Sequence, residues 1–298
     1  MSDSKDTLII GVDGGGTGCR VAVGTERDGV LIVQSGGRAN VSTDLVLAIA
    51  NIKEAVEAAT LQAGLDPKVL DRAIAHLGLA GVMTQADADK VARALPYANC
   101  AVTDDRLTVV IGALDGADGF LVSTGTGTII ATCQAQKLRY VGGWGFHVSD
   151  QASAAWLGRL ALDRTLQCHD KVLGHTDMTR KLLAHFNSDP NAIVTFSMSA
   201  SPSDYGSFSP LVVDAATKGD ALGLELMRDG ADYITRGLTA LGFKEGDALC
   251  LTGGVGPHYA PFLGQDLTGR IVQAKRTAVE GAFHMALLAA RKMNRVGT

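Results

Sequence analysis

Cysteine is scarce in this 298-residue chain, and its five residues are scattered. No C-x-x-C pair occurs, so the spacing argues against a disulfide framework, a cysteine zinc site and a cysteine-bound cluster. We interpret the cysteines as reduced thiols of a cytoplasmic protein. They are Cys19, Cys100, Cys133, Cys168 and Cys250.

Long apolar runs and a basic excess are also missing. No stretch reaches the ~18 apolar residues of a membrane helix, and the polar N-terminus lacks the apolar core of a signal peptide. The 27 Lys and Arg are outnumbered by 31 Asp and Glu, for a net charge of -4. A basic surface for nucleic acid is therefore not expected. We expect a cytoplasmic protein whose partners are neither nucleic acid nor a membrane.

Glycine, in contrast, is abundant. The chain has 36 glycines against 7 prolines, roughly 12% of its length where ~7% is ordinary. Hydrophobic residues make up 46%, enough for a large core, and the length predicts two domains or one large one. Surplus glycine indicates tight turns and close approaches of backbone to backbone or ligand. We expect the surplus to be concentrated at one binding cleft.

The hydrophobic pattern of the first third predicts an α/β domain that opens with an antiparallel meander. Ser42 and Thr43 are candidate N-caps of its first helix, and Gly64 is the candidate C-terminal stop. The predicted order is strands 7–13, 19–24 and 30–34, helix 44–64, strand 72–79, helix 84–95 and strand 100–104.

A strand, a glycine turn and a second strand then recur about one domain later. Strands 119–123 and 129–133 flank the second turn, as strands 7–13 and 19–24 flank the first. This repeat predicts two similar halves. The rest is predicted as a mostly helical region 150–245, a strand 248–251 and a closing helix 278–293.

Both glycine turns suit phosphate binding, because glycine lets several backbone N–H groups converge on an anion. The alternative is a plain tight hairpin, which two matched turns make less favoured. Other glycine motifs fail. A P-loop needs Gly-Lys-Ser or Gly-Lys-Thr, which does not occur, and a dinucleotide fingerprint opens a helix, whereas these turns lead into strands.

Three aspartates end predicted strands. Asp13 is a candidate Mg²⁺ ligand beside the first turn, since Mg²⁺ keeps waters next to one or two carboxylates; the alternative is a turn aspartate. Asp104 and Asp105 end a second strand, where a carboxylate suits a general base for a hydroxyl nucleophile. One of the two is alternatively the N-cap of the next helix.

Two further glycine segments are candidates for ligand contacts. Residues 142–150 combine glycines with Trp144 and Asp150, a combination that sugar recognition uses, although a core tryptophan is the alternative. Gly253 and Gly254 follow a strand and suit either a nucleoside or a plain strand–helix turn.

Together, VDGGGT (12–17), STGTGT (123–128) and LTGGVG (251–256) resemble the two phosphate motifs and the adenosine motif of the actin-like ATPase superfamily of hexokinases, acetate kinase and Hsp70. More narrowly, nearly the whole chain resembles the branch of N-acetylglucosamine kinases, bacterial glucosamine kinases and BadF/BcrA-type ATPases. The resemblance implies two actin-like, ribonuclease H-like domains with a cleft between them, and ATP with Mg²⁺ as cofactors. Such kinases are typically dimers, so a homodimer is expected.

The resemblance also implies roles for individual residues. The segments GGRAN (36–40) and GLAG (78–81) match sugar-side loops, and the catalytic aspartate falls on Asp105. The implied ATP contacts are Gly15, Gly16, Thr17, Thr126, Gly127, Gly253 and Gly254, with Asp13 for the metal. The implied sugar contacts are Asn40, Asp105, Thr128, Gly143, Trp144, Gly145 and Asp150.

Finer details favour glucosamine as the substrate. Ser149-Asp150-Gln151 is closer to the bacterial glucosamine kinases, and residues 185–187 and 204–210 resemble them too. Ile129 stands where acetylglucosamine kinases carry a sugar-contacting asparagine. In the other direction, Gly-Gly-Trp-Gly is the acetylglucosamine-kinase form, and Ala152 replaces a usual glycine.

We therefore expect an ATP-dependent kinase acting on the 6-hydroxyl of glucosamine. Its domains are expected at 1–112 and 113–282, the latter with a helical insertion, and the closing helix 283–298 is expected to pack back on the first. N-acetylglucosamine kinase is the alternative. An ATPase activator that works through a cysteine-bound cluster is opposed by the cysteine spacing, and a sugar-responsive repressor by the short tail before Thr7.

Overall fold

The computed structural model describes residues 7–135 and 137–296, which divide into two compact units. Unit 1 comprises the chain up to Gly116 together with the chain from Ala274 onward, and unit 2 comprises Ala117–Gln273. These bounds differ from the expected 112/113 and 283. The reason is that the amides of Lys275 and Arg276 donate to the carbonyls of Ala113 and Gly112 (3.0 and 2.8 Å), which joins this segment to unit 1.

Unit 1 is a five-stranded sheet in the order β3-β2-β1-β4-β5. The first three strands form the predicted antiparallel meander, and β4 and β5 run parallel to β1. Its elements are β1 (Leu8–Gly14), β2 (Cys19–Thr25), β3 (Gly29–Gly36), α1 (Leu45–Gln62), the 3₁₀ helix η2 (Pro67–Arg72), β4 (Ile74–Leu79), α2 (Gln85–Ala94), β5 (Asn99–Thr103), α3 (Asp105–Leu114) and α11 (Ala278–Val296).

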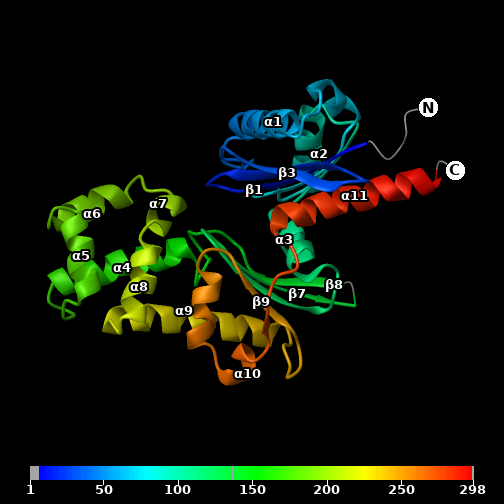
Figure 1. The fold of residues 1–298 in the computed structure, drawn as a ribbon. Coiled ribbons are helices and arrows are strands. Elements are labelled where there is room, and N and C mark those ends of the chain that lie inside the picture. Colours follow the sequence, from blue (N-terminus) through cyan, green and yellow to red (C-terminus); the bar gives the residue numbers. More distant parts are fainter. Residues whose placement is uncertain (1–6, 136, 297–298) are drawn as a thin grey trace. The chain divides into compact units, whose positions relative to one another are not determined.

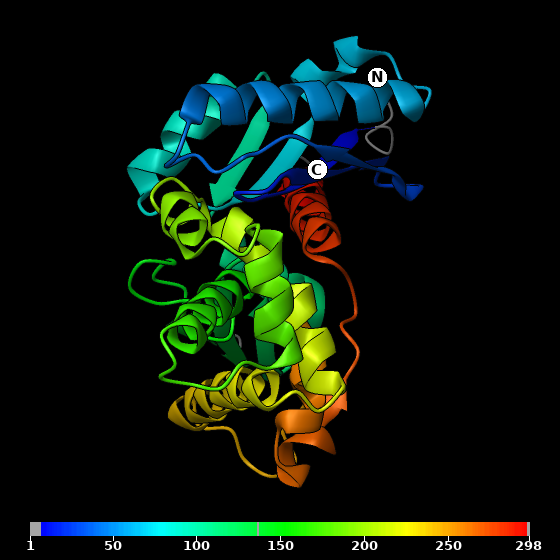
Figure 2. The same ribbon diagram turned by 90° about the vertical axis from the view of Figure 1, so that its left-hand side faces the viewer.

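Helices cover both faces of this sheet. Helices α1 and α2 share one hydrophobic core with the strands, and α11 packs on the opposite face, as Figures 1 and 2 show for α1 (blue) and α11 (red). Gly64 has φ +75° just after α1, as predicted for a helix stop. The predicted N-caps were wrong, because Asp44 caps α1 by accepting from the amide of Leu47. The amides of Ser42 and Thr43 instead donate to the side chain of Asn40.

Unit 2 repeats the topology of unit 1. Its sheet order is β10-β9-β6-β7-β8, with an antiparallel meander β6-β7-β8 and with β9 and β10 parallel to β6. The predicted recurrence of similar halves is thus confirmed at the level of strand order. The sheet elements are β6 (Gly119–Thr124), β7 (Thr128–Gln134), β8 (Lys137–Gly142), β9 (Leu249–Thr252) and β10 (Ile271–Val272); β8 and β10 were not predicted.

The remaining part of unit 2 is helical, as expected. Its helices are α4 (Ala154–His169), α5 (Asp177–His185), α6 (Pro190–Ser197), α7 (Pro202–Gly206), α8 (Ser209–Thr217), α9 (Ala221–Ala240), the 3₁₀ helix η3 (Gly256–Phe262) and α10 (Gln265–Thr268). None of the helices described has both the length and the apolar character needed to cross a bilayer.

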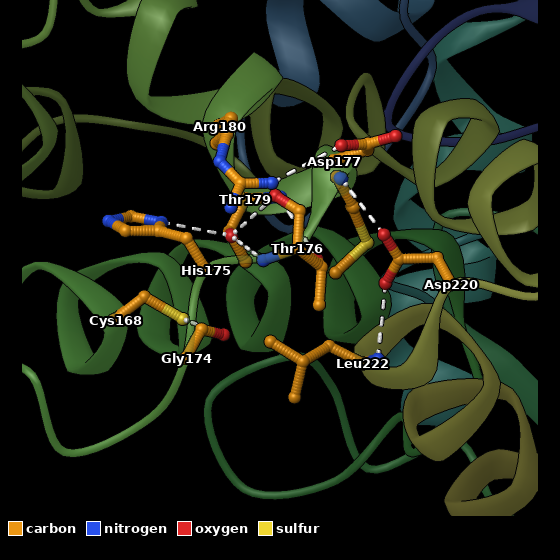
Figure 3. A network of polar contacts seen from close by, with 10 residues as sticks. Cys168, Gly174, His175, Thr176, Asp177, Thr179, Arg180, Asp220 and Leu222 are labelled. Carbon is orange, nitrogen blue, oxygen red and sulfur yellow. Dashed lines mark hydrogen bonds and ion pairs between the residues drawn. The ribbon is translucent and has the colours of Figure 1, made fainter.

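One aspartate joins two of these helices. Asp220 accepts from the amides of Leu222 and Gly223 (both 3.1 Å) as the N-cap of α9. Its other oxygen accepts from the amide of Met178 (3.0 Å) in the first turn of α5 (Figure 3). A single carboxylate therefore satisfies orphan amides of two helices.

Several glycines serve packing rather than ligands, which corrects the expectation that the surplus is concentrated at one cleft. A Cβ on Gly11 of β1 would lie 2.2 Å from the backbone nitrogen of Phe283, and one on Gly281 would lie 2.4 Å from the carbonyl oxygen of Thr108. Gly158 and Gly112 make comparable backbone approaches. Glycine at these places lets strands and helices of one unit meet backbone to backbone.

Candidate functional site

The carboxyl ends of the parallel strands β1, β4 and β5 lie at one edge of the unit 1 sheet. Asp13 of β1 is paired with Gly78 of β4, and Gly78 with Thr103 of β5. Asp104 and Asp105 follow directly. The edge therefore brings together the first glycine turn, the 78–81 loop and the aspartate pair.

Backbone hydrogen bonds join three loops at this edge. The amide of Ala80 donates to the carbonyl of Gly14 (2.8 Å), the amide of Ala39 to Gly15 (3.0 Å), and the amide of Val41 to Ala80 (3.0 Å). We call segments 14–18, 38–41 and 78–81 the unit 1 loop cluster. Three segments that the sequence motifs singled out separately are thus connected by backbone hydrogen bonds into one group of loops.

Asn40 has a restricted role in this cluster. Its Oδ1 accepts from the amide of Ser42 (3.0 Å) and from the Ser42 hydroxyl (2.8 Å). Gly81, at φ +87°, leaves room for this oxygen, because a Cβ there would lie 2.5 Å from it. The side-chain amide of Asn40 can therefore serve a ligand through its Nδ2 donor.

The two adjacent aspartates are in different situations. Asp104 is the N-cap of α3, as one of the two was predicted to be, and its Oδ1 accepts from the amide of Arg106 (3.0 Å). The Arg106 guanidinium also donates to both Asp104 oxygens (2.9 and 3.2 Å). Asp105 is the first residue of α3. It is the better candidate for a base, since Asp104 is engaged by the helix and by Arg106.

Electrostatics favour a proton-accepting Asp105. Burial raises the pKa of this carboxyl to about 6, and the negative charges of Asp13 and Asp104 add to the effect, while Arg106 opposes it. A carboxylate with a pKa close to neutrality is suited to general-base work. Burial also raises the pKa of Asp13, against the opposing charge of Arg20.

Sequence reasoning missed His76, which lies in β4 and is 5% exposed. Its Nε2 is 3.2 Å from the hydroxyl of Thr103, the residue before the aspartate pair. The only sequence signal is a single imidazole within the otherwise apolar run IAHLGL.

In unit 2, three loops are likewise joined. The amide of Val255 donates to the carbonyl of Thr124 (3.0 Å), and the amide of Ala154 to Gly125 (2.8 Å). The hydroxyl of the fully buried Tyr259 donates to the carbonyl of Ala152 (2.8 Å). We call segments 123–128, 150–154 and 252–256 the unit 2 loop cluster. Tyr259 had no sequence signal.

Some glycines of these clusters lie open, with no neighbour that requires them. A Cβ on Gly16, Gly125 or Gly254 would meet nothing within 4 Å, and none of the three has a left-handed φ. Gly15 is nearly as open, with its nearest atom at 3.9 Å. Neither backbone conformation nor packing requires glycine at these positions, so their open side is left accessible to an external group.

The glycines at the other predicted ATP positions have neighbours. A Cβ on Gly253, which has φ +82°, would lie 2.2 Å from the carbonyl oxygen of Thr124, and one on Gly127 would lie 2.9 Å from Oδ2 of Asp150. These two glycines are needed by the fold of the loops themselves. Thr126 is half-buried and Thr17 exposed.

Three threonine hydroxyls around the unit 2 loop cluster are buried and have no hydrogen-bond partner among the described residues. They belong to Thr124, Thr128 and Thr252. Buried polar groups are normally satisfied, so unpaired hydroxyls gathered at one strand edge indicate room for a polar ligand or for water.

The 142–150 segment holds Asp150 inside and Trp144 outside. Asp150 is 7% exposed, and backbone N–H groups of Thr128 and Gly145 face its carboxylate; burial nevertheless raises its pKa. Trp144 is 78% exposed, so the core alternative for it was wrong. Gly143 and Gly145 on either side have φ of 73° and 95°, which turns the chain sharply around the indole.

A pocket of about 620 Å³ lies next to the third glycine segment, in unit 2. Its walls are mostly apolar, with Arg228, His258 and Thr217 as polar groups. The other lining residues come from α8, α9 and η3 and are Val213, Ala216, Leu224, Met227, Pro257, Pro261 and Phe262. The size and the lining suit a planar, partly apolar ligand.

A metal site built from protein side chains alone is not found. Within residues 7–135 and 137–296, no three His, Cys, Asp or Glu side chains are grouped to hold an ion. Asp13 with a neighbouring carboxylate fits the needs of Mg²⁺, which takes one or two carboxylates and completes its shell with water or phosphate oxygens.

The two repeated sheets, each with flanking helices, match the two-domain actin-like sugar kinase fold. The chain belongs to the BadF/BadG/BcrA/BcrD ATPase family, whose sequence model matches residues 10–286. It is 31% identical over 278 residues to the glucosamine kinase GspK of Vibrio cholerae, covering 93% of this chain and 95% of that protein.

Solved structures agree with this fold. The structure of a candidate N-acetylglucosamine kinase of Chromobacterium violaceum is similar with a TM-score of 0.89 and 29% identity, covering 96% of this chain and all of that one. A ROK-family glucokinase of Streptomyces griseus, solved with glucose and AMPPNP, shares the fold at a TM-score of 0.59 and 18% identity, over 96% and 99% of the chains.

Proposed function

We propose that this protein is an ATP-dependent kinase that phosphorylates the 6-hydroxyl of glucosamine. The observation that carries the proposal is the set of open glycines, Gly16 in unit 1 with Gly125 and Gly254 in unit 2. The unpaired Thr124, Thr128 and Thr252 hydroxyls lie at the same strand edge as the second and third of these. The likeness to the Vibrio cholerae glucosamine kinase supports the same reaction.

The phosphates need converging N–H donors, and the glycine turns offer them. In this proposal the backbone at Gly15, Gly16 and Thr17 and at Thr126 and Gly127 contacts the phosphates of ATP. The apolar pocket beside Gly253 and Gly254 takes the adenine. Asp13 holds Mg²⁺, which neutralises charge on the phosphates when bound.

Asp105 is the proposed base. It accepts the proton of the sugar 6-hydroxyl while that oxygen attacks the γ-phosphorus, and the bond from the γ-phosphorus to the bridging oxygen of ADP breaks. The reaction yields glucosamine 6-phosphate, ADP and a proton that Asp105 later releases. Its pKa of about 6 leaves the carboxylate mostly ionised at neutral pH and still able to accept the proton.

The proposed sugar contacts come from the unit 1 loop cluster, from Thr128 and from the 142–150 segment. Asn40 donates through Nδ2, and Thr128, Gly143, Trp144, Gly145 and Asp150 are the other proposed contacts. Ile129, next to Thr128, is only 8% exposed and offers no hydrogen bond to an acetamide. This favours the free amine of glucosamine over the acetylated sugar.

N-acetylglucosamine is the second candidate substrate, because the Chromobacterium violaceum protein carries that description. The test is ADP release, measured by a coupled assay with Mg-ATP and each sugar separately: glucosamine, N-acetylglucosamine and glucose. The proposal expects the highest kcat/KM with glucosamine. A preference for N-acetylglucosamine would reject the substrate, and no turnover with any sugar would reject the kinase.

Matched glycine variants test the phosphate contacts. Gly16→Ala and Gly125→Ala should keep the wild-type Tm, because the added methyl group meets no protein atom, but should raise the KM for ATP about tenfold or more, roughly the loss of one or two hydrogen bonds to charged groups. Gly174→Ala, at an exposed position outside the clusters where the added methyl group likewise meets no protein atom and φ is not left-handed, is the matched control. Unchanged ATP affinity in both loop variants would contradict the assignment.

We also propose a homodimer, because the kinases that the chain resembles are typically dimeric. Light scattering after size-exclusion chromatography gives the mass directly, and a monomer at micromolar concentration would reject this part alone.

A further inference from the structure

His76 is a buried imidazole in the middle of β4, and its side chain is hydrogen-bonded. Each residue of β4 is buried, and the others are Ile, Ala, Leu, Gly and Leu. A buried polar ring costs free energy unless it is hydrogen-bonded. Its bond partner is the hydroxyl of Thr103, 27 residues later in the chain, at 3.2 Å.

The donor and acceptor of the His76–Thr103 hydrogen bond follow from a second hydrogen bond that Thr103 makes. The Thr103 hydroxyl donates to the carbonyl oxygen of Asp104 at 3.0 Å. A hydroxyl has one proton, so both bonds exist together only when Nε2 of His76 carries the hydrogen and donates to Thr103. Burial lowers the pKa of His76 to about 4, and the ring is therefore a neutral donor at physiological pH.

The chain of two bonds ends at the peptide group that precedes Asp105. The carbonyl of Asp104 and the amide of Asp105 belong to one planar peptide group. The hydrogen bond from Thr103 to the Asp104 carbonyl oxygen therefore fixes the direction in which the chain enters α3 at Asp105. From the other side, the Thr108 hydroxyl donates to the carbonyl of Asp105 at 2.9 Å. Thr108 itself packs against Gly78, where a Cβ would lie 2.2 Å from its hydroxyl oxygen.

We propose that His76 is a positioning residue for Asp105, acting through Thr103 and the Asp104 carbonyl. The proposal rests on the proposed function, in which Asp105 is the base. His76 touches neither substrate nor metal in this scheme. Its effect is on turnover, because a shift of a catalytic group by about 1 Å can cost about 10²-fold in rate.

Kinetics of four variants test the proposal. His76→Leu and Thr103→Val each remove the bond, and we expect a fall in kcat of about tenfold with the KM for sugar and ATP within about twofold, since misplacing the base affects the reaction step more than binding. The double variant should lose no more than either single one, because both break one chain of contacts. His76→Gln places an amide Nε2 near the same position and should recover most of the turnover.

Val102→Ala is the matched control for lost stability. Val102 precedes Thr103 in β5 and belongs to the core on the α1 side of the sheet, so its truncation destabilises unit 1 without removing the bond. A variant His76→Leu that keeps its kcat, or that loses no more kcat than Val102→Ala, would overturn the positioning role. A change confined to KM would do the same.

A ¹⁵N NMR measurement of the His76 ring separates this proposal from the proposed function. We expect the neutral Nε2–H tautomer from pH 5.5 to 8 and a changed Nε2 shift in Thr103→Val. A charged ring or an Nδ1–H tautomer would overturn the positioning role even in an active kinase. A wild-type protein that turns over no sugar would reject the proposed function, while the tautomer still decides whether the bond exists.

Discussion

Replacing Asp105 with Asn should make the protein more stable and less active at the same time. In the folded protein the pKa of Asp105 is about 6, whereas an unperturbed aspartate has a pKa of about 3.9. At ~1.4 kcal/mol per pH unit this difference amounts to ~3 kcal/mol. The side chain is partly exposed, so solvent screening reduces the expected gain to ~1–2 kcal/mol.

The sign of the pH dependence follows from proton binding. Between pH 4 and 6, roughly the pKa values of the unfolded and folded chains, the folded protein binds more protons at Asp105, so wild-type stability falls as the pH rises. Asparagine does not titrate. The stabilisation by Asp105→Asn should therefore be absent below about pH 4 and complete above about pH 6, relative to wild type.

The assay combines thermal unfolding at pH 4.5 and 7.5 with ADP release at pH 7.5. We expect a higher Tm for Asp105→Asn at pH 7.5 and a loss of kcat by a factor of roughly 10² to 10⁴, the usual share of a general base. Asp104→Ala is the matched neighbour, since it removes the N-cap of α3 and should lose about 0.5–2 kcal/mol. An Asp105→Asn protein no more stable than wild type at pH 7.5 would refute the electrostatic reasoning, and one with near wild-type turnover would refute the base assignment.

Two further predictions concern packing away from Asp105. Asp220→Ala removes the N-cap of α9 and the bond to the Met178 amide, and should lower the free energy of unfolding at pH 7 by about 2–3 kcal/mol in urea titrations, with Asp177→Ala, exposed on α5, as control. Hydrogen bonds hold the pKa of Asp220 below its ordinary value although burial opposes them, so this loss should shrink as the pH falls below about 4. Gly11→Ala should destabilise unit 1 far more than Gly16→Ala, because its methyl group would overlap the α11 backbone; equal Tm values would contradict the described packing.

Local features of the fold were predictable because they depend on neighbours in the chain. The two glycine hairpins, the cap of α3 at one of the two aspartates and the stop of α1 at Gly64 follow from turn and capping chemistry within a few residues. The edge strand β8 was missed, since Lys137, Arg139 and Tyr140 show little apolar character and the strand is held by pairing with β7.

The candidate site was predictable in its motifs and not in its connections. The sequence alone singled out the glycine turns and the pair Asp104 and Asp105, but only the structure shows that α3 starts at Asp105 and that Asp104 caps it. The resemblance likewise implied a sugar contact at Asn40, but only the structure shows that its side-chain oxygen is used within its own loop.

By itself, the sequence determined the meander and most of the element order of unit 1, the repeated glycine hairpin, the family and the places where phosphates and a base are to be sought. Only the tertiary structure decided which glycines carry backbone contacts, as Gly11 does against α11, and which lie open, as Gly16 does. It also joined His76 to Thr103 and Tyr259 to Ala152. The physical reason is that a missing Cβ or a buried hydroxyl takes its meaning from atoms far along the chain, which meet it only when the sheets and helices pack.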